Sequence, residues 1–556
     1  MVLRPGGVPE IPAATAELAW KVHPRGTDEM RVRDALGVLF RDEDFLSGEL
    51  KGMYSPLGQP GLSPALLLVV TVLQFLHNLS DREAARAAAD RISWKYMLGL
   101  ALDDVGFDAS VLSEFRDRLA VGSRADRLLS VLLERLQAAG LVRAGGPQRT
   151  DATHVLACVR RLNRIEQVGE SLRAALEEIA RTAPTWLVPL LQPGWDERYG
   201  RKVEASRLLK HKNASAVKLA EQIGADGRAL LDKIDTDPVA GWMHDLPQVK
   251  VLRTMWAHHY DQTSTGRLRW KETAELPPAA VRIQSPYDPD ARYSTKRDTE
   301  WVGSKAHLSE SCDEDLPSLI TDVHTTAATD PDVTATTPIQ EKLTERGLAP
   351  GEHLMDAGYP SAENITRALE LGITMISPLT VTTGRNATKG TFPPSAFTLG
   401  WDAGTATCPA GATSLPARTE GRGLVVFPFS TRDCRPCPLR PRCTLADPSH
   451  PRRITVHPRP VWETQIRAQQ AQTTTQWRTT YNQRAGVEGT ISQAVRGPDL
   501  RHARYRGMPK THLQNVLTGI ALNVLRLGAW FDPRPTTQRR PTRIHALCTA
   551  HGLAAA

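Results

Sequence analysis

The sequence predicts a mixed α/β fold with a helical domain at its start and an irregular, cysteine-containing segment near its end. Three observations favour this class. Residues 28–140 show helical periodicity, residues 281–377 alternate strand and helix patterns, and residues 380–460 are rich in Gly, Pro and Thr with little periodicity. The chain has 556 residues, which is long enough for two or three domains with separate cores.

Residues 1–143 are predicted to form a helical domain for DNA binding or assembly. Ser63 followed by Pro64 is typical of a helix start, Asp81–Asp90 is an alanine-rich helix, and Ser110–Leu119 adds another. Two interpretations stay open for this domain. One is a packing or dimerisation bundle, and the other is a helix-turn-helix-like DNA reader.

Residues 144–379 are predicted to form the first part of a mixed sheet, with a helical insertion at about 165–275. A short β-branched strand is expected at 148–157. Further strands and helices are expected in the order strand, strand, strand, strand, helix, strand, helix, strand, at 281–284, 291–294, 301–308, 319–325, 339–346, 353–359, 361–371 and 373–377. This alternation indicates a sheet with helical connections.

Residues 461–530 are predicted to be helices that complete the core, and the Arg-, Pro- and Thr-rich residues 531–556 are predicted to be a disordered basic tail. The longest apolar run, at 65–76, has a polar interruption and is too short to span a bilayer. The first residues lack the apolar core of a signal peptide, so a cytoplasmic, nucleoid-associated protein is expected.

The positive charge of the chain is concentrated in its last part. The formal net charge is +8, and residues 451–550 contain sixteen Lys or Arg against four Asp or Glu. Such a balance favours a polyanionic partner. Glu488 opens a helical run inside this basic region, which is an expected place for a divalent metal next to a polyanionic substrate.

Two further acids stand out by their local context. Asp151 lies within a predicted strand, and Asp356 lies at the end of a later one, before an Ala-Gly-Tyr turn. A buried strand carboxylate is unfavourable unless it is paired or binds metal. Taken singly, Asp356 is also explained as a turn or capping residue, and Asp151 as a cap or as a partner of Arg149. Only the fold could bring these acids to Glu488.

Four of the seven cysteines are clustered in the irregular segment: Cys408, Cys434, Cys437 and Cys443. A Cys-x2-Cys pair with two more thiols within reach is typical of a tetrahedral site, so a structural Zn²⁺ is predicted. Reduced thiols in a loose segment and an iron–sulfur cluster are the alternatives. The odd number of cysteines fits a reducing cytoplasm better than a disulfide framework.

Four blocks of the sequence, taken in order, carry a resemblance to a known family. They are residues 149–155, residues 287–297 with 301–310, residues 356–359, and the motif Tyr481-x2-Arg484-x3-Glu488. Together they resemble the blocks of bacterial insertion-sequence transposases of the DDE type. The eleven-eighty-two group of insertion sequences, near the IS4/IS5-like families, is the most similar. The resemblance covers nearly the whole chain, including its helical start.

The resemblance implies an RNase H-like catalytic core in which Asp151, Asp356 and Glu488 are the catalytic triad. Such a triad holds two Mg²⁺ ions, which activate water or a DNA 3′-hydroxyl and stabilise the leaving oxygen during phosphoryl transfer. Mn²⁺ is expected to substitute in vitro. The cysteine-rich residues 380–460 would then be an insertion before the last catalytic helix.

The resemblance also implies DNA-binding residues around the triad. Arg484 and Tyr481, one and two turns before Glu488 on its helix, are expected to contact phosphate beside the metals. The family pattern has a Lys seven residues after the Glu, where this chain has Val495. Basic residues after the helix and two residues of a central strand complete the expected DNA surface: Arg496, Arg501, Arg504, Arg506, Lys510, Lys305 and His307. A solvated cationic face is the alternative for the basic residues after the helix.

The function predicted from the sequence is a DNA transposase that cleaves insertion-sequence ends and joins them to target DNA. Its expected partners are double-stranded DNA, as transposon ends and as target, and a second copy of the chain, because two ends must be paired. No membrane partner is expected. The alternatives are a DDE-type nuclease or host-adopted DNA-binding protein without strand transfer, and a zinc-dependent regulator without catalysis.

Overall fold

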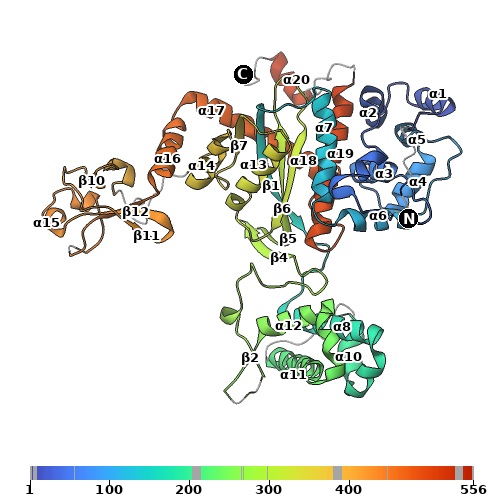
Figure 1. Cartoon of the computed structure of the whole chain (residues 1–556), viewed down its shortest axis with the longest axis horizontal. Coiled ribbons are helices and arrows are strands. Elements are labelled where there is room, and N and C mark those ends of the chain that lie inside the picture. The colour runs from blue at the N-terminus through green and yellow to red at the C-terminus, as the bar shows by residue number, and fades with distance from the viewer. Residues whose placement is uncertain are drawn as a thin grey trace.

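A computed structural model describes residues 3, 9–55, 57–202, 214–264, 266, 268–296, 299–379, 391–447, 449–532, 542–551 and 553. A mixed β-sheet with helices around it forms the centre (Figure 1). The N-terminal helices pack at one side of the sheet, a helical unit lies below it in this view, and a small β unit projects from the opposite side. The mixed α/β class predicted from the sequence is confirmed.

The N-terminal part of the chain is helical. Its elements are α1 (Ala13–Val22), α2 (Asp28–Leu36), η1 (Asp42–Phe45), η2 (Gly48–Leu50), α3 (Pro64–Leu76), α4 (Asp81–Asp90), α5 (Ile92–Leu98), α6 (Ser110–Leu119) and α7 (Arg124–Ala138). Helix α3 begins as predicted, because the Ser63 hydroxyl accepts a hydrogen bond from the Leu66 N–H at 3.1 Å and Pro64 occupies the first turn. Ser80 and Glu83 form a capping box at the start of α4.

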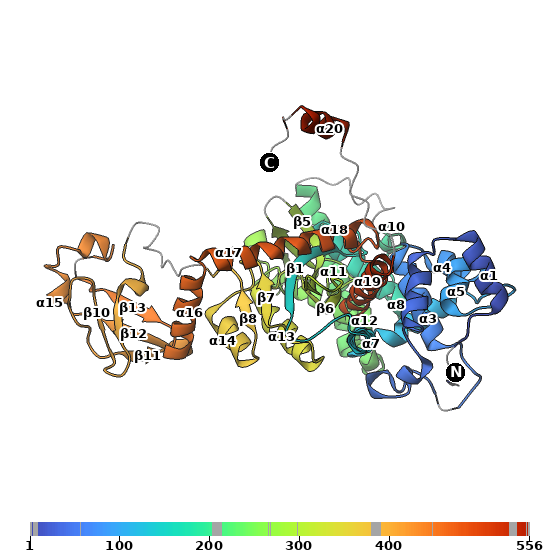
Figure 2. The same ribbon diagram turned by 90° about the horizontal axis from the view of Figure 1, so that it is seen from above.

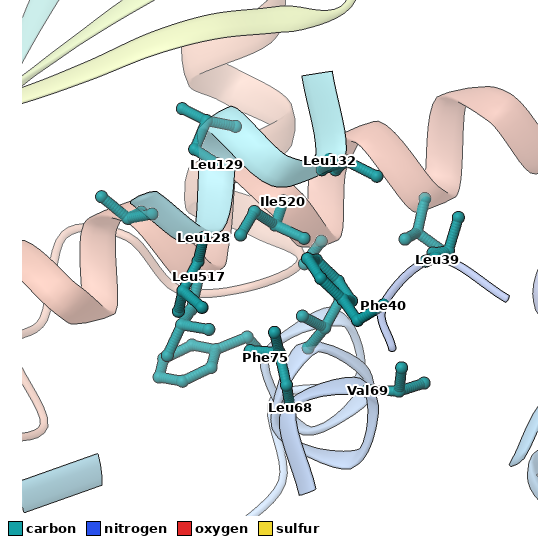
Figure 3. Close-up of a cluster of buried hydrophobic side chains, with 14 of the residues drawn as sticks. Leu39, Phe40, Leu68, Val69, Phe75, Leu128, Leu129, Leu132, Leu517 and Ile520 are labelled. Atoms are coloured by element: carbon teal, nitrogen blue, oxygen red, sulfur yellow. The ribbon is translucent and has the colours of Figure 1, made fainter. Parts of the chain in front are cut away.

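The C-terminal helix α19 (Met508–Trp530) completes this bundle. Side chains such as Phe75, Leu129 and Ile520, from α3, α7 and α19, meet in one apolar cluster (Figure 3). The same cluster continues into the sheet through Leu308 and Val323, so the bundle and the sheet share a core. Among the described helices, none is by itself long and apolar enough to cross a membrane; α3 and α4 pass that test only as a pair bent by 111°.

The central sheet is built from the following strands: β4 (Arg292–Lys296), β5 (Thr299–Ser311), β6 (Ile320–Ala327), β1 (Pro147–Leu156), β7 (Glu352–Met355) and β8 (Thr374–Ile376). Strand β1 runs antiparallel to β5 and parallel to β7, and β7 runs parallel to β8. Strands β4 and β6 share the other edge of β5. Helices α13 (Thr336–Glu345) and α14 (Ala362–Glu370), with η8 (Asp332–Thr334) before α13, connect β6 to β7 and β7 to β8. Strand β1 is therefore central.

Residues 281–284 are irregular, although their pattern predicted a strand. Ile283 is buried in the core of the helical unit, so its apolar character reflects loop packing. Pro286 and Pro289 follow and have no backbone N–H to donate to a sheet. The next strand, β4, begins only at Arg292.

A helical unit lies between β1 and β4. It contains α8 (Arg164–Thr182), α9 (Pro184–Leu187), η3 (Val188–Leu190), α10 (Trp195–Tyr199), α11 (Ala214–Thr236), η6 (Pro238–Asp245), α12 (Pro247–His259), β2 (Tyr260–Gln262), β3 (Leu268–Trp270) and η7 (Thr273–Glu275). Asn163 caps α8 by accepting hydrogen bonds from the N–H groups of Ile165 and Glu166, each at 3.0 Å. Leu172 and Met255 lie in the apolar core of this unit.

A small β unit lies between β8 and the next long helix. It contains η10 (Pro394–Ala396), β9 (Thr398–Gly400), β10 (Thr405–Thr407), β11 (Arg418–Glu420), η11 (Gly421–Gly423), β12 (Leu424–Pro428), α15 (Thr431–Cys434), η12 (Arg440–Arg442) and β13 (Arg453–Val456). The sequence showed little periodicity here because the strands are only three to five residues long. Phe397, Phe427 and Phe429 form its core. Residues 380–390 of the predicted insertion lie outside the described residues.

The C-terminal part consists of α16 (Arg459–Ala471), α17 (Thr475–Asn482), η13 (Gln483–Ala485), α18 (Gly486–Arg496), α19 and α20 (Arg543–Ala550). The sequence predicted one helix carrying Tyr481, Arg484 and Glu488. The structure divides it into α17, η13 and α18, which follow one another almost in line (Figure 2). Helix α20 lies within the tail that was predicted to be disordered, and residues 533–541, 552 and 554–556 of that tail lie outside the described residues.

Candidate active site

The first two acids of the predicted triad lie side by side on neighbouring strands. Strands β1 and β7 pair in parallel up to Thr150 and Met355, and each acid is the next residue along its own segment: Asp151 after Thr150, and Asp356 after Met355. Neighbouring strands are about 4.8 Å apart, so the two carboxylates are within electrostatic reach. Burial raises the pKa of the Asp151 carboxyl, and the negative charge of Asp356 raises it further.

Asp356 also shapes the turn that ends β7. Its Oδ1 accepts a hydrogen bond from the Gly358 N–H at 2.8 Å, and its carbonyl oxygen accepts one from Ser377 Oγ at 2.7 Å. A Cβ on residue 358 would lie 3.0 Å from that Oδ1, which favours glycine there. The turn role inferred from the sequence is therefore present, and it uses one carboxylate oxygen.

Arg484 connects the first acid to the third. Its Nη1 lies 3.1 Å from Asp151 Oδ2, and its Nη2 lies 3.1 Å from Glu488 Oε1. The side chains of Arg484 and Asp151 are each 16% exposed, whereas that of Glu488 is 66% exposed. The arginine thus joins an inner and an outer carboxylate. The alternative pairing of Asp151 with Arg149 is not formed, because Arg149 bonds to Glu310 instead.

Tyr481 extends this cluster along α17. Its ring stacks on Trp477, one turn earlier, with centroids 4.9 Å apart and an interplanar angle of 14°. The Arg484 guanidinium lies 5.9 Å from the centre of the Tyr481 ring. Burial raises the pKa of Tyr481, although Arg484 acts to lower it. Trp477 was not identified from the sequence, although its spacing of one helical turn from Tyr481 was visible.

A fully buried carboxylate ties α18 to the sheet. Glu310 of β5 is 0% exposed and bonds to Arg149 Nε at 2.6 Å, Thr490 Oγ1 at 2.5 Å and Arg526 Nη1 at 2.6 Å. Thr490 lies on α18, two residues after Glu488, and Arg526 lies on α19. These bonds connect β1, β5, α18 and α19, and therefore hold the helix that carries the third acid.

Arg149 also defines the start of α18. Its Nη1 donates to the carbonyl oxygen of Gln483 at 2.8 Å, and a Cβ on Gly486 would lie 2.0 Å from that nitrogen. Only a residue without a side chain leaves room for the guanidinium. The positioning role of Glu310 was not predicted from the sequence. An acid within an otherwise buried strand was the available signal.

Two residues predicted to contact DNA are engaged inside the fold. His307 is 1% exposed, and its ring nitrogens lie 2.7 Å from the Tyr359 hydroxyl and 3.0 Å from Thr326 Oγ1. Lys305 Nζ lies 2.7 Å from Asp332 Oδ1, and both side chains are 15% exposed. Both side chains therefore bond to groups of the protein itself. Lys305 and His307 are therefore left out of the DNA surface proposed below.

Two of the basic residues predicted after α18 are occupied by the N-terminal bundle. The Arg504 guanidinium lies 4.7 Å from the centre of the Phe75 ring and donates to the Leu79 carbonyl oxygen at 2.7 Å. Lys510 pairs with Asp117 of α6 at 2.5 Å. Arg504 thus joins the bundle to the core, and we also leave it out of the DNA surface.

The other basic residues after α18 are more accessible. Arg496 and Arg506 are exposed, and Arg501 is half-buried with its Nε 3.4 Å from Thr153 Oγ1 on β1. Lys296, at the end of β4, was not identified from the sequence. It is exposed and close enough to Asp151 to favour the charged carboxylate, against the larger effect of burial.

Four cysteines of the small β unit line one cavity of about 500 Å³: Cys408, Cys434, Cys437 and Cys443. Burial raises the pKa of the Cys443 thiol, Arg452 acts to lower it, and the other three thiols raise it. All four are free thiols. The cysteines thus converge, yet among the described residues no group of three or more His, Cys, Asp and Glu side chains is arranged to hold a metal ion.

The carboxylates fit Mg²⁺ by their chemistry. Asp151 and Asp356 supply hard oxygen ligands. A bound cation would reduce the repulsion between their negative charges. In this structure Arg484 partly neutralises the acids, because its guanidinium lies between Asp151 and Glu488. A metal ion bound by all three acids has to share or displace this guanidinium.

Two family models match parts of the chain. One, described as a Transposase DDE domain, matches residues 407–528, and the other, a Transposase domain (DUF772), matches residues 25–118. The first includes Glu488 and the four clustered cysteines, whereas Asp151 and Asp356 lie outside it. No curated protein and no solved structure matches the chain. The two matches support an insertion-sequence transposase family and, more generally, an enzyme that cleaves nucleic acid.

Proposed function

We propose that this protein is a DDE transposase that cleaves DNA at the ends of its insertion sequence and joins those ends to target DNA. The arrangement of Asp151, Asp356 and Glu488 around Arg484 carries the proposal. Three segments that are far apart in sequence supply these acids, and the transposase matches support the same function. The proposed group is that of the eleven-eighty-two insertion sequences.

An RNase H-like core is part of the proposal. The sheet order β6–β5–β1–β7–β8, with an antiparallel start followed by two parallel strands reached through helices, supports it. Asp151 lies on the central strand, Asp356 follows the neighbouring strand, and Glu488 lies on a helix packed on that sheet. The core is thus assembled from residues 144–379 and 461–530, with the small β unit between them.

The proposed triad would hold two Mg²⁺ ions, or Mn²⁺ in vitro, which when bound supply the charge that activates the attacking oxygen and stabilises the leaving oxygen. The chain's own residues position the substrate. Arg484 neutralises Asp151 and Glu488 before DNA binds, and its guanidinium is placed to bind a backbone phosphate. Tyr481, stacked on Trp477, supports that guanidinium from the side of α17.

The proposed DNA surface surrounds this centre. It includes Arg496, Arg501, Arg506, Lys510 and the newly identified Lys296. Arg496 and Arg506 are exposed and none of the described carboxylates is paired with them, as expected for side chains that bind phosphate. Lys510 would exchange its surface pairing with Asp117 for DNA, which costs little because exposed ion pairs contribute at most about 1 kcal/mol.

Two further components belong to the proposal. A structural Zn²⁺ is proposed for the cavity lined by Cys408, Cys434, Cys437 and Cys443, because four convergent thiols match the donor set of a tetrahedral zinc site. A dimer is proposed for the complex with DNA, because both ends of the element must be held together during joining.

Cleavage of a donor plasmid tests the function. The plasmid carries the element with its native flanks and is incubated with protein and Mg²⁺. The Glu488→Gln variant should lose cleavage by roughly 10²-fold or more, because it removes a charge that acts directly at the reacting phosphate. The matched control is Glu463→Gln on α16, where the acid is 46% exposed and paired with Arg459. Full activity of Glu488→Gln would refute the triad.

Addition of a second plasmid separates transposition from the alternatives. Joined donor–target products identify a transposase. Cleavage without joined products identifies a nuclease, and binding without cleavage by the wild-type protein identifies a DNA-binding relative. Gel electrophoresis of the same reaction, with bound and free DNA resolved, distinguishes the three outcomes.

A further inference from the structure

A basic cavity lies where the helical unit meets the sheet. It has a volume of about 640 Å³ and is lined by residues from the β1–α8 connection, the start of α8, residues 273–284 and β4. Four of the lining side chains are arginines: Arg160, Arg161, Arg164 and Arg282. The cavity is separate from the triad and from the cysteine site.

The charges of these arginines are only partly compensated. Arg161 pairs with Glu300 at 2.9 Å, and Arg160 lies 3.6 Å from Glu166. Within the described part of the chain, no carboxylate lies within ion-pair distance of Arg164 or Arg282.

Arg164 and Arg282 also repel each other. Burial lowers the pKa of Arg164, and the charge of Arg282 lowers it further. The Arg164 guanidinium stacks 4.3 Å from the centre of the Trp270 ring and donates to the Lys271 carbonyl oxygen at 2.8 Å, so it is held in place. A bound anion would reduce the repulsion between the Arg164 and Arg282 charges, neither of which is paired with a described carboxylate.

The helix that borders the cavity adds to its positive potential. Helix α8 has 19 residues, and its N-terminal end, capped by Asn163, lines the cavity. The N-terminus of such a helix carries about half a positive charge, which the Glu166 carboxylate of its capping box partly offsets. Gln167 and Gln284 are also part of the lining, so polar side chains surround the arginines.

Basic residues connect this cavity to the proposed active site. The Arg161 guanidinium lies 5.3 Å from the centre of the Tyr293 ring on β4. Lys296, at the end of the same strand, acts on the charges of both Asp151 and His154. Positive charge therefore continues from the triad along β4 to the cavity.

The separation between the triad and the cavity is shorter than one turn of duplex DNA. Arg160 follows Asp151 by nine residues, which even in a fully extended chain span at most about 30 Å. One turn of B-DNA is about 34 Å long. A duplex whose phosphate lies at the triad therefore reaches the cavity within about one helical turn.

We propose that the cavity lined by Arg160, Arg161, Arg164 and Arg282 binds the phosphate backbone of double-stranded DNA within one helical turn of the cleaved phosphate. This inference rests on the proposed function. The helical unit then serves as a clamp for DNA beyond the catalytic core, and the length of DNA bound exceeds that covered by the triad and its surrounding cations.

The test compares two lengths of DNA. The long duplex carries the element end with about 20 base pairs on each side of the cleavage point, and the short duplex carries about 5, half a turn. Binding of both is measured as a function of salt for the wild type and for Arg160→Gln/Arg282→Gln. Neither of these arginines stacks on an aromatic side chain of the helical unit. A thermal unfolding midpoint confirms that the variant folds.

The variant should bind the long duplex more weakly, with a slope of log K against log salt that is smaller in magnitude by about 1.8, because each lost phosphate contact removes about 0.9. Binding of the short duplex should be unchanged. The control, Arg181→Gln, removes an exposed charge in the last turn of the same helix, about 25 Å from its start, and should leave both slopes unchanged.

An unchanged slope on the long duplex would overturn the inference, and so would an equal loss on both duplexes. These outcomes are distinct from failure of the proposed function. If the proposed function is wrong, the wild-type protein neither binds nor cleaves the element end, and this result does not depend on the arginines of the cavity.

Discussion

Replacement of Glu310 by Ala tests how α18 is held in place. The carboxylate is 0% exposed and bonds to Arg149, Arg526 and Thr490, while the side chains of the two arginines are each 15% exposed. Removal of the acid leaves two largely buried guanidinium groups without their counter-charge. Breaking a buried ion pair by removing one partner typically costs about 3–5 kcal/mol. We expect this destabilisation to be localised at the contacts between α18 and the sheet.

Amide hydrogen exchange measures this loss locally, which suits a chain with several separate cores. A decrease of about 3 kcal/mol in the free energy of opening corresponds to an exchange rate about 10²-fold faster. We expect this acceleration in residues 486–496, with no change in the helical unit at α11. Glu310→Gln keeps the shape and part of the hydrogen bonding, so it should give a smaller acceleration and retain more cleavage activity than Glu310→Ala.

Glu300→Gln is the matched control on the same strand. Glu300 pairs with Arg161, but it is 50% exposed, and an exposed pair contributes at most about 1 kcal/mol. If Glu310→Ala accelerates exchange in α18 no more than Glu300→Gln does, the proposed anchoring of that helix is refuted.

Three more predictions follow from the same structure. Gly486→Ala should destabilise the start of α18 by about 1–3 kcal/mol, since its Cβ would lie 2.0 Å from Arg149 Nη1; unaltered hydrogen exchange there would contradict this. Burial lowers the pKa of His353 to about 4, below its value of about 6.5 in an unfolded chain, so the unfolded state takes up the proton first. Stability should therefore fall as the pH drops from about 6.5 to 4, by up to about 1.4 kcal/mol per unit, and His353→Gln should flatten that slope in thermal unfolding. Cys437→Ser should abolish stoichiometric zinc in elemental analysis of purified protein, while Cys158→Ser should not; zinc-free wild-type protein would remove the proposed site.

The sequence predicted much of the sheet because several of its strands have clear strand patterns and because helices separate β6, β7 and β8. Strand β1, with Asp151, and strand β7, followed by Asp356, lie where the patterns placed them. Their pairing could not be predicted from local patterns, because it depends on the register between distant strands. The grouping of these two acids with Glu488 was predicted from the resemblance to a family. Their spacing in the sequence did not predict it.

The errors arose where local patterns do not reveal tertiary neighbours. His307 and Lys305 alternate with apolar residues as in a half-exposed strand, but His307 is buried against Tyr359 and Lys305 pairs with Asp332. The strand predicted at 281–284 is a loop, because an apolar residue buried by the helical unit gives the same signal as a strand. In the same way, the packing of Arg504 on Phe75 has no signal in the local sequence.

The central claim is that Asp151, Asp356 and Glu488 form one metal-binding catalytic centre. The most direct test is a crystal structure with the DNA of an element end and Mn²⁺, with the metal located by its anomalous scattering. We predict Mn²⁺ bound by Asp151 and Asp356, with the Arg484 guanidinium moved from its present position between Asp151 and Glu488. Mn²⁺ located away from these carboxylates in a complex that cleaves its DNA would contradict the claim.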